Sequence, residues 1–95
     1  MSVDTTAIIF KGFQISKEEY EKLSDEFREN WAISFNAYSE EGPYAVGYEI
    51  THCGVGDITP IKEITDIYNK RLVADCEKES LKLRELRLYL GVKLW

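Results

Sequence analysis

The chain has 95 residues, of which 44% are hydrophobic and 31% charged, and this composition is typical of one folded domain. It excludes a disordered chain, and no apolar run is long enough to span a membrane. We therefore expect a single domain over residues 1–95 that does not bind membranes. Two cysteines are too few for a disulfide framework, and the N-terminus has no signal-peptide pattern, so we expect free thiols and a cytoplasmic location.

One segment carries the formal net charge of −5. Acidic and basic side chains balance in residues 1–15 and again in residues 42–95. Residues 16–41 contain eight acidic and three basic side chains. An acidic surface of this kind suits a partner with a basic surface. The predicted partner-binding residues are Glu18, Glu21, Asp25, Glu29, Glu40 and Glu41.

The N-terminal part of the chain predicts a strand followed by a helix. Residues 5–10 (TTAIIF) are β-branched and apolar, as strand residues are, and Gly12 predicts a bulge or bend after them. Ser16 and Glu19 have the spacing of a capping box, which predicts a helix over residues 17–30. The apolar face of this helix consists of Tyr20, Leu23, Phe27 and Trp31.

The middle of the chain predicts a β-hairpin. Residues 33–39 and residues 44–51 read as two strands joined by a tight turn at residues 41–42. This register places all the apolar residues of the hairpin on one face, and a slip by one residue would scatter them. The predicted pairs are Ala37 with Val46, Phe35 with Tyr48, and Ile33 with Ile50.

Residues 60–90 are predicted to form one unusually long helix. Thr59 is a suitable N-cap, Pro60 suits the first helical position, and no further proline or glycine occurs before Gly91. Such a helix would be about 46 Å long, whereas a domain of this size has a radius of gyration of about 12 Å. The helix should therefore extend beyond the domain or bend near Asp75.

A second apolar row on this helix predicts a contact surface. Its residues recur every seven positions, opposite the face that should pack on the core. The row could contact a second copy of the chain or another partner. Alternatively, the C-terminal residues 92–95 could cover it, and the sequence does not favour one alternative over the other. The predicted oligomerisation residues are Ile67, Ala74, Leu81 and Leu88.

The predicted fold class is α+β. A small antiparallel sheet of three strands should carry two helices on one face, in the order β-α-β-β-α. The second helix should be the unusually long one. Because Gly91 allows the chain to turn back, a fourth strand over residues 92–95 is an alternative.

Candidate catalytic and metal-binding residues are few. His52 is the single histidine and lies next to Cys53, but neighbouring residues of a strand point to opposite faces and cannot act as base and nucleophile. Cys76 or Asp57 could join His52 at a metal ion, although their spacing matches no zinc pattern. We therefore predict no catalytic residue, no metal and no cofactor.

Direct nucleic-acid binding is not expected, because the chain is acidic and has no basic groove. Its aromatic residues also fall on faces that are predicted to be buried, so they suit a core better than a platform for stacked bases. The aromatic residues concerned are Tyr20, Phe27, Trp31, Phe35 and Tyr48.

The leading functional hypothesis is therefore a small acidic protein-binding module and not an enzyme. Its sharper form is an inhibitor or regulator that imitates nucleic acid and occupies a basic, nucleic-acid-binding groove of its target. By size and charge, accessory proteins of phages and mobile elements that block host defence nucleases provide an analogy. One alternative is a structural or oligomerisation subunit that uses the long helix. A third hypothesis, a small enzyme or ligand-binding protein, requires His52, Asp57 and Glu49 to meet in a pocket.

Overall fold

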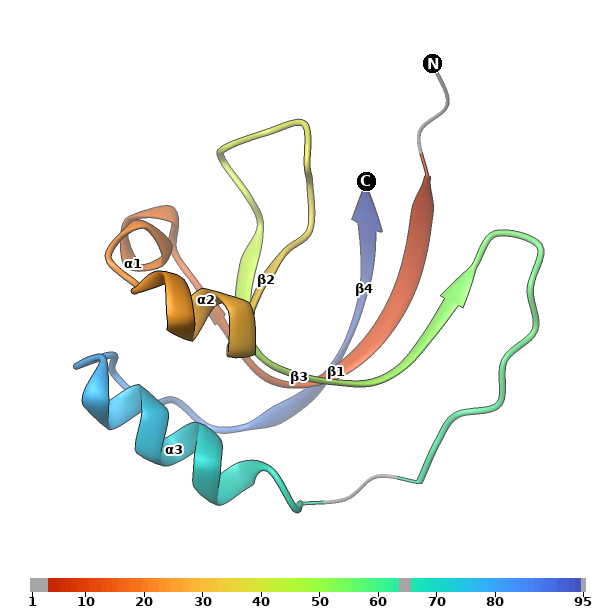
Figure 1. Cartoon of the computed structure of the whole chain (residues 1–95). Coiled ribbons are helices and arrows are strands. Elements are labelled where there is room, and N and C mark those ends of the chain that lie inside the picture. Colours follow the sequence, from red (N-terminus) through yellow and green to blue (C-terminus); the bar gives the residue numbers. More distant parts are fainter. Residues whose placement is uncertain (1–3, 64–65, 95) are drawn as a thin grey trace.

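The structure is a computed structural model that describes residues 4–63 and 66–94. Within these residues the fold is α+β, with a curled antiparallel sheet of four strands and three helices (Figure 1). The elements are β1 (Thr5–Ile15), α1 (Lys17–Glu21), α2 (Asp25–Trp31), β2 (Ala32–Ser34), β3 (Tyr44–Gly54), α3 (Asn69–Lys78) and β4 (Arg87–Leu94). None of the helices in this part of the chain is long and apolar enough to cross a membrane.

The sheet has the strand order β2-β3-β1-β4, so the longest strands lie at its centre. β1 and β3 approach each other closely where Gly12 pairs with Gly47. A Cβ atom on Gly12 would lie 1.9 Å from the carbonyl oxygen of Val46, so only glycine fits at this crossing. The register between the two strands also shifts at Ile9 and Phe10, where a β-bulge bends the sheet.

The curl brings β4 back to the segment that follows β2 (Figure 1). The backbone N–H of Leu94 donates to the carbonyl oxygen of Phe35 at 2.8 Å, and the N–H of Ala37 donates to the carbonyl oxygen of Leu94 at 3.1 Å. These two bonds form the parallel bridge between Asn36 and Leu94, which joins the ends of the curled sheet.

Each face of the sheet buries its own apolar cluster. On one face, residues of β1 and β3 pack against α2 and α3, so the expectation of helices on one face is confirmed. The buried side chains of this cluster include Phe13, Val46, Tyr48, Phe27, Trp31, Leu72 and Cys76. On the other face, Phe10 and Phe35 lie with ring centroids 5.5 Å apart, together with Ile8 and Ala45.

The capping box at Ser16 and Glu19 is confirmed, but the single helix over residues 17–30 is wrong. The chain leaves the helix after α1 and begins α2 with Ser24 as a new N-cap, whose hydroxyl accepts from the N–H of Phe27. The predicted apolar face is still the packed one, since Leu23, Phe27 and Trp31 are buried and Tyr20 is partly buried.

The predicted long helix is wrong, because α3 covers only ten residues of it. Residues 60–63 are irregular and exposed, and residues 64–65 lie outside the described part of the chain. α3 ends because Ser80 adopts a positive φ of 57°, and the N–H of Leu81 then bonds to the carbonyl oxygen of Cys76. The residues that should have continued the helix form β4 instead.

The strand count and order must also be corrected. The sheet has four strands in the described residues, and the C-terminal strand that we considered as an alternative is β4, which begins at Arg87. Gly91 therefore lies inside a strand and not at a turn, and Trp95 lies outside the described residues. The observed order is β-α-α-β-β-α-β.

The predicted hairpin register is wrong as well. Ile33 pairs with Ala45 and not with Ile50, and a loop over residues 35–43 replaces the tight turn. The shift is by an odd number of residues, so Ile33 and Phe35 lie on the face opposite Val46. Each face of this sheet buries an apolar cluster, so the alternation of apolar residues does not select a register.

Candidate functional site

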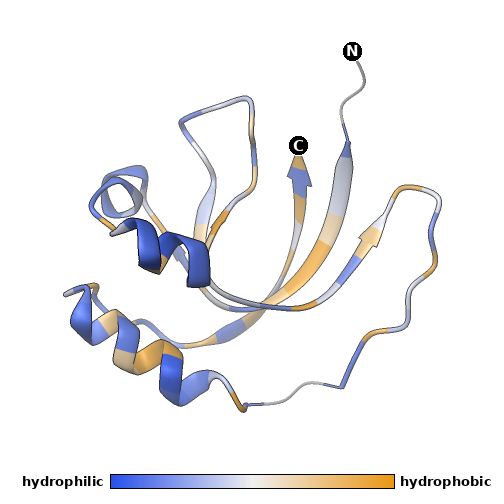
Figure 2. Ribbon diagram, in the orientation of Figure 1, coloured by the Kyte–Doolittle hydropathy of each residue, from blue (hydrophilic) through white to orange (hydrophobic). Residues whose placement is uncertain are grey.

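All six residues that were predicted to bind a partner are exposed. They come from α1, from α2 and from the loop over residues 35–43, which lie on the same side of the molecule in Figure 1. Figure 2 shows α1 and α2 as mainly hydrophilic on their outer sides. We call this surface the acidic face; it consists of Glu18, Glu21, Asp25, Glu29, Glu40 and Glu41.

Specific contacts hold the loop beside α1. The ammonium group of Lys17 lies 3.2 Å from Oε1 of Glu41, and the rings of Tyr20 and Tyr44 stack with centroids 4.1 Å apart. The hydroxyl of Tyr44 donates to the carbonyl oxygen of Glu40 at 2.6 Å. The hydrogen bond to Glu41 raises the pKa of Lys17, and the negative charges of Glu21 and Glu40 add to this effect. The acids of α1 and of the loop therefore form one negative region around a single lysine.

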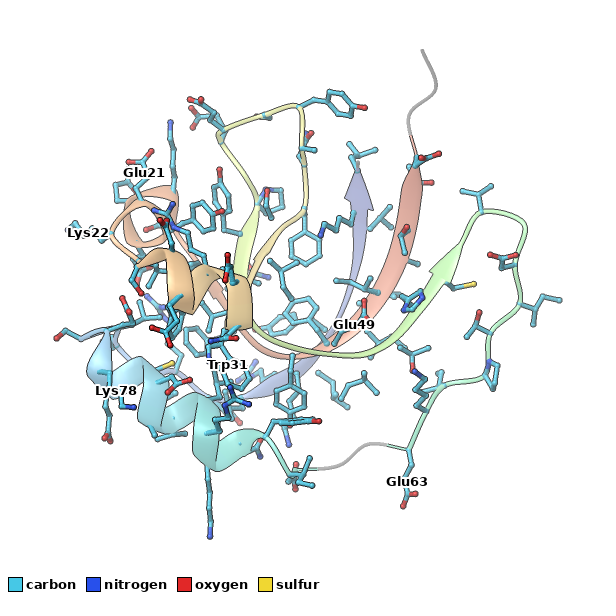
Figure 3. All side chains as sticks on the ribbon, viewed as in Figure 1. Glu21, Lys22, Trp31, Glu49, Glu63 and Lys78 are labelled. Atoms are coloured by element: carbon cyan, nitrogen blue, oxygen red, sulfur yellow. The ribbon has the colours of Figure 1, made fainter. Side chains whose placement is uncertain are left out.

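The helix dipole of α2 stabilises one of its acidic residues. Ser24 ends the previous turn and caps α2, so Asp25 stands in the first turn, where the helix dipole favours a negative charge. The single helix predicted over residues 17–30 would have placed Glu21, Asp25 and Glu29 on one helix and Asp25 in its second half, and both placements are wrong. Only Asp25 and Glu29 share a helix at the i, i+4 spacing, while Glu21 belongs to α1 (Figure 3).

The fold makes little use of the acidic face. Within the described residues, no basic group lies within ion-pair distance of Glu18, Glu21, Glu29 or Glu40. Asp25 has one marginal contact, at 4.0 Å from Arg28, and its side chain is almost fully exposed. These carboxylates are therefore available to a partner.

Glu19, by contrast, is an acid that the fold does use. Its carboxylate lies 2.7 Å from Nη2 of Arg84, and it also closes the capping box with Ser16. Partial burial acts to raise the pKa of Glu19, but hydrogen bonds from Arg84 and Ser16 outweigh it, so the pKa lies below its ordinary value. The guanidinium of Arg84 also lies over the ring of Phe13, at 5.5 Å from its centroid. This pair ties α1 to the segment before β4.

The residues predicted to mediate oligomerisation do not form a row. Ile67 is exposed in the turn before α3, and Ala74 is exposed on α3. Leu81 follows α3 and packs against the helix-covered core, whereas Leu88 lies in β4. The row depended on the long helix, so the structure removes the basis of this predicted contact surface.

His52 and its neighbouring cysteine behave as the strand geometry predicts. The thiol of Cys53 donates to the carbonyl oxygen of Asp57 at 3.2 Å, while His52 lines a pocket elsewhere. Cys76 is completely buried in the core, and burial raises the pKa of its thiol to about 11. Among the described residues, no group of three histidine, cysteine or acidic side chains could hold a metal ion.

An open pocket of about 610 Å³ brings two of the three residues of the enzyme hypothesis together. Nδ1 of His52 lies 3.2 Å from Oε2 of Glu49, and both side chains line this pocket. Glu49, which Figure 3 labels, belongs to β3. Asp57 does not line the pocket, and Lys93 of β4, which we did not predict there, does.

The exposure of Leu90 and Val92 in β4 was not predicted, whereas Leu88 was predicted to be exposed but on a helix. Leu88, Leu90 and Val92 are exposed, although each is a large apolar residue. Their alternation with Arg87, Tyr89 and Lys93 has the period of a strand and could have revealed them. The segment was predicted to be helical because no proline or glycine interrupts residues 61–90.

The chain matches no family model, no curated protein and no solved structure with significance.

Proposed function

We propose that the protein is a small binding module whose acidic face docks on a basic surface of another protein. The observation that carries this proposal is the concentration of exposed carboxylates on α1, α2 and the neighbouring loop, most of which have no ion-pair partner in the described residues. Carboxylates without an ion-pair partner repel one another in the free protein. A basic partner would replace this repulsion by attraction.

The arrangement of the acidic face supports docking on an extended basic surface. Its carboxylates come from α1, from α2 and from the loop over residues 35–43. The Tyr20–Tyr44 stack and the Lys17–Glu41 ion pair hold the loop against α1, and Nε of Arg28 in α2 donates to the carbonyl oxygen of Tyr20 at 3.2 Å. A prearranged surface loses little conformational entropy on binding. The partner that fits best is a protein whose basic groove otherwise holds nucleic acid, because such a groove presents cations to a line of negative charges. The protein then acts as an inhibitor or regulator of that partner.

A capture experiment with matched variants tests this proposal. The wild-type protein and the triple variant Glu21→Lys/Asp25→Lys/Glu29→Lys are used as baits in lysate from the native cells. The control bait is Asp57→Lys/Glu63→Lys/Glu77→Lys, which changes the net charge equally at exposed acids outside the acidic face. We expect a protein that the wild type and the control capture and the face variant loses, and that duplex DNA displaces. Equal capture by all three baits would contradict the proposal.

The pocket beside His52 favours a second candidate function, the binding of a small ligand. Its polar side chains include the Glu49–His52 pair and Lys93, and its apolar lining includes Ile8 and Ile33. A few polar groups over an apolar floor are typical of ligand sites. A fragment screen followed by NMR tests this candidate, with the amide of Gly47 as a reporter in the pocket wall. Fragments that bind there should shift this signal in the wild type but not in His52→Ala.

A further inference from the structure

The outer edge of β4 presents backbone groups with no strand beside them in the described residues. At its C-terminal end, Leu94 directs its N–H and C=O away from β1, since both bond to the segment over residues 35–37. Backbone groups of a strand alternate between its two sides, so Val92, Leu90 and Leu88 direct theirs the same way. Within the described part of β4, the backbone bonds from the segment over residues 35–37 go to Leu94, which leaves the outer backbone groups of those three residues open at the edge.

The same three residues expose apolar side chains. The exposed fractions are 48% for Leu88, 74% for Leu90 and 60% for Val92. Natural edge strands usually carry charges, prolines or bulges that prevent pairing with another chain, but the five residues between Arg87 and Lys93 have none of these. An open pocket of about 310 Å³ lies on the face of the sheet beside β4, and its lining includes Phe10 of β1, Ala45 of β3 and Leu90 of β4. The edge therefore has unpaired backbone groups that another strand could bond to, and exposed apolar side chains beside them.

We propose that a second copy of this chain pairs with the first along β4, in an antiparallel arrangement in which Tyr89 lies opposite its own copy. A twofold axis perpendicular to the two strands produces this arrangement and closes the assembly at a dimer. The sheets of the two copies then form one continuous sheet.

Three registers bring the open residues of the two strands together, and the structure distinguishes them. If Gly91 lay opposite its own copy, Leu88 would have to bond to Leu94 of the second copy, whose outer groups are already occupied. If Leu90 lay opposite its own copy, Arg87 would face Lys93 of the second copy, and like charges directly opposite each other repel. With Tyr89 on the axis, neither conflict arises.

The register centred on Tyr89 is complementary along its length. Leu88 lies opposite Leu90 of the second copy, so exposed leucines meet on one face of the joined strands. Glu85 and Leu86 precede β4, and Leu86 packs partly against the helix-covered core. The pairing would extend the strand by these two residues, which would place Leu86 opposite Val92 and Glu85 opposite Lys93 of the second copy, and the twofold axis would repeat both pairs. Glu85 already contacts Arg87 through Oε2, so the second-copy lysine would extend an existing ion pair. Because the strand is complementary to itself in this register, we assign a second copy of the chain as the partner at this edge.

Sedimentation velocity on the wild type and two variants tests the dimer. We expect a reversible dimer to form between about 1 and about 200 µM, the range for a small interface. Leu90→Lys should remain monomeric, while Leu83→Lys, the same change at a side chain that is 42% exposed outside β4, should dimerise normally. Val92→Lys provides a second edge variant, and circular dichroism confirms that each variant is folded. A wild type that stays monomeric, or an equal effect of Leu83→Lys, would overturn the proposal.

Charge exchange then tests the register. Lys93→Glu replaces two attractive contacts in the dimer by two repulsive ones, which should raise the dimer dissociation constant about tenfold. The double variant Glu85→Lys/Lys93→Glu restores opposite charges across the twofold axis and should recover most of the affinity. If the double variant dimerises no better than Lys93→Glu, the register centred on Tyr89 is refuted. These variants leave the acidic face unchanged, so the result is independent of the proposed function.

Discussion

The indole Nε1 of Trp31 donates a hydrogen bond to Oδ2 of Asp75 at 2.8 Å, and this contact joins α2 to α3. Trp31 is buried, and the guanidinium of Arg71 lies 5.6 Å from the centroid of its ring (Figure 3). Because the inner side of α2 is fixed in this way, Asp25 and Glu29 remain on its outer side. The orientation of the acidic face thus depends on a contact between two helices far apart in the sequence.

Removal of Asp75 should destabilise the protein. In Asp75→Ala the indole N–H of Trp31 loses its acceptor in a partly buried site, which costs about 1–3 kcal/mol. Urea unfolding measures the loss, with Glu77→Ala as the control because Glu77 is exposed on the same helix. Equal stability of the two variants would show that the contact does not hold α2 in place.

The ion pair between Glu19 and Arg84 should make stability depend on pH in the acid range. Both side chains are partly exposed, so we expect Glu19→Gln to cost about 1 kcal/mol at pH 7. The pKa of Glu19 is lower in the folded state than its ordinary value of 4.5, so the folded state binds this proton less readily than the unfolded state does. The stabilisation is therefore complete above pH 4.5 and is lost as the pH falls through the folded-state pKa.

Unfolding curves of the wild type and Glu19→Gln at several pH values measure this effect. The two proteins should converge in stability as the pH falls below about 4.5. Glu18→Gln is the matched control, because Glu18 is an exposed neighbour on α1 without an ion pair in the described residues. A constant difference between wild type and Glu19→Gln at every pH would contradict the assigned pKa direction.

The two thiols should differ in reactivity. Cys76 is completely buried and the pKa of its thiol is raised from 9.0 to about 11, whereas Cys53 is partly exposed. A disulfide reagent at pH 8 should therefore modify Cys53 quickly and Cys76 only after unfolding.

Between pH 9 and 11 the unfolded chain loses the Cys76 proton and the folded chain keeps it, so the free energy of unfolding should fall as the pH rises in this range. Cys76→Ala should show a shallower fall, and an equally steep one would contradict this prediction.

Gly12 and Gly91 should tolerate alanine differently. A Cβ on Gly12 meets backbone atoms of Val46 and Gly47, which cannot move without separating β1 from β3. We expect Gly12→Ala to cost more than about 3 kcal/mol or to prevent folding. A Cβ on Gly91 meets the ring of Phe35 at 2.5 Å, and a side chain can turn away, so Gly91→Ala should cost less. Thermal unfolding ranks the two variants, and the reverse order would contradict the close approach of β1 and β3.

Local signals in the sequence predicted local structure correctly. The capping box at Ser16 lies in the chain where it was predicted, because its hydrogen bonds involve residues three positions apart. The buried side of α2 was also predictable, since Phe27 and Trp31 follow the helical period. The exposed acids of the candidate surface were predictable for the same reason, as charged residues opposite an apolar helix face remain in water.

Structure that depends on distant contacts was not predictable in the same way. Residues 81–90 contain several good helix formers, yet residues 87–94 form β4 because β1 offers a complete strand to pair with, and residues 81–86 are irregular. Ser80 ends α3 in a conformation that glycine usually adopts, so no glycine marked this helix end. The pocket joins Glu49 and His52 of β3 to Lys93 of β4, and only the curl of the sheet brings these residues together.

The affinity of the captured partner for the acidic face tests the central claim most directly. Calorimetry or interferometry would measure the dissociation constant of the wild type, of Glu21→Lys/Asp25→Lys/Glu29→Lys and of the control Asp57→Lys/Glu63→Lys/Glu77→Lys. We predict that wild-type binding weakens at least tenfold between about 50 and about 300 mM salt, because exposed charge pairs are screened over roughly 10 Å or less. The face variant should lose binding while it remains folded, and the control should bind as the wild type does. Normal binding by the face variant at physiological salt would contradict the claim that this surface binds the partner.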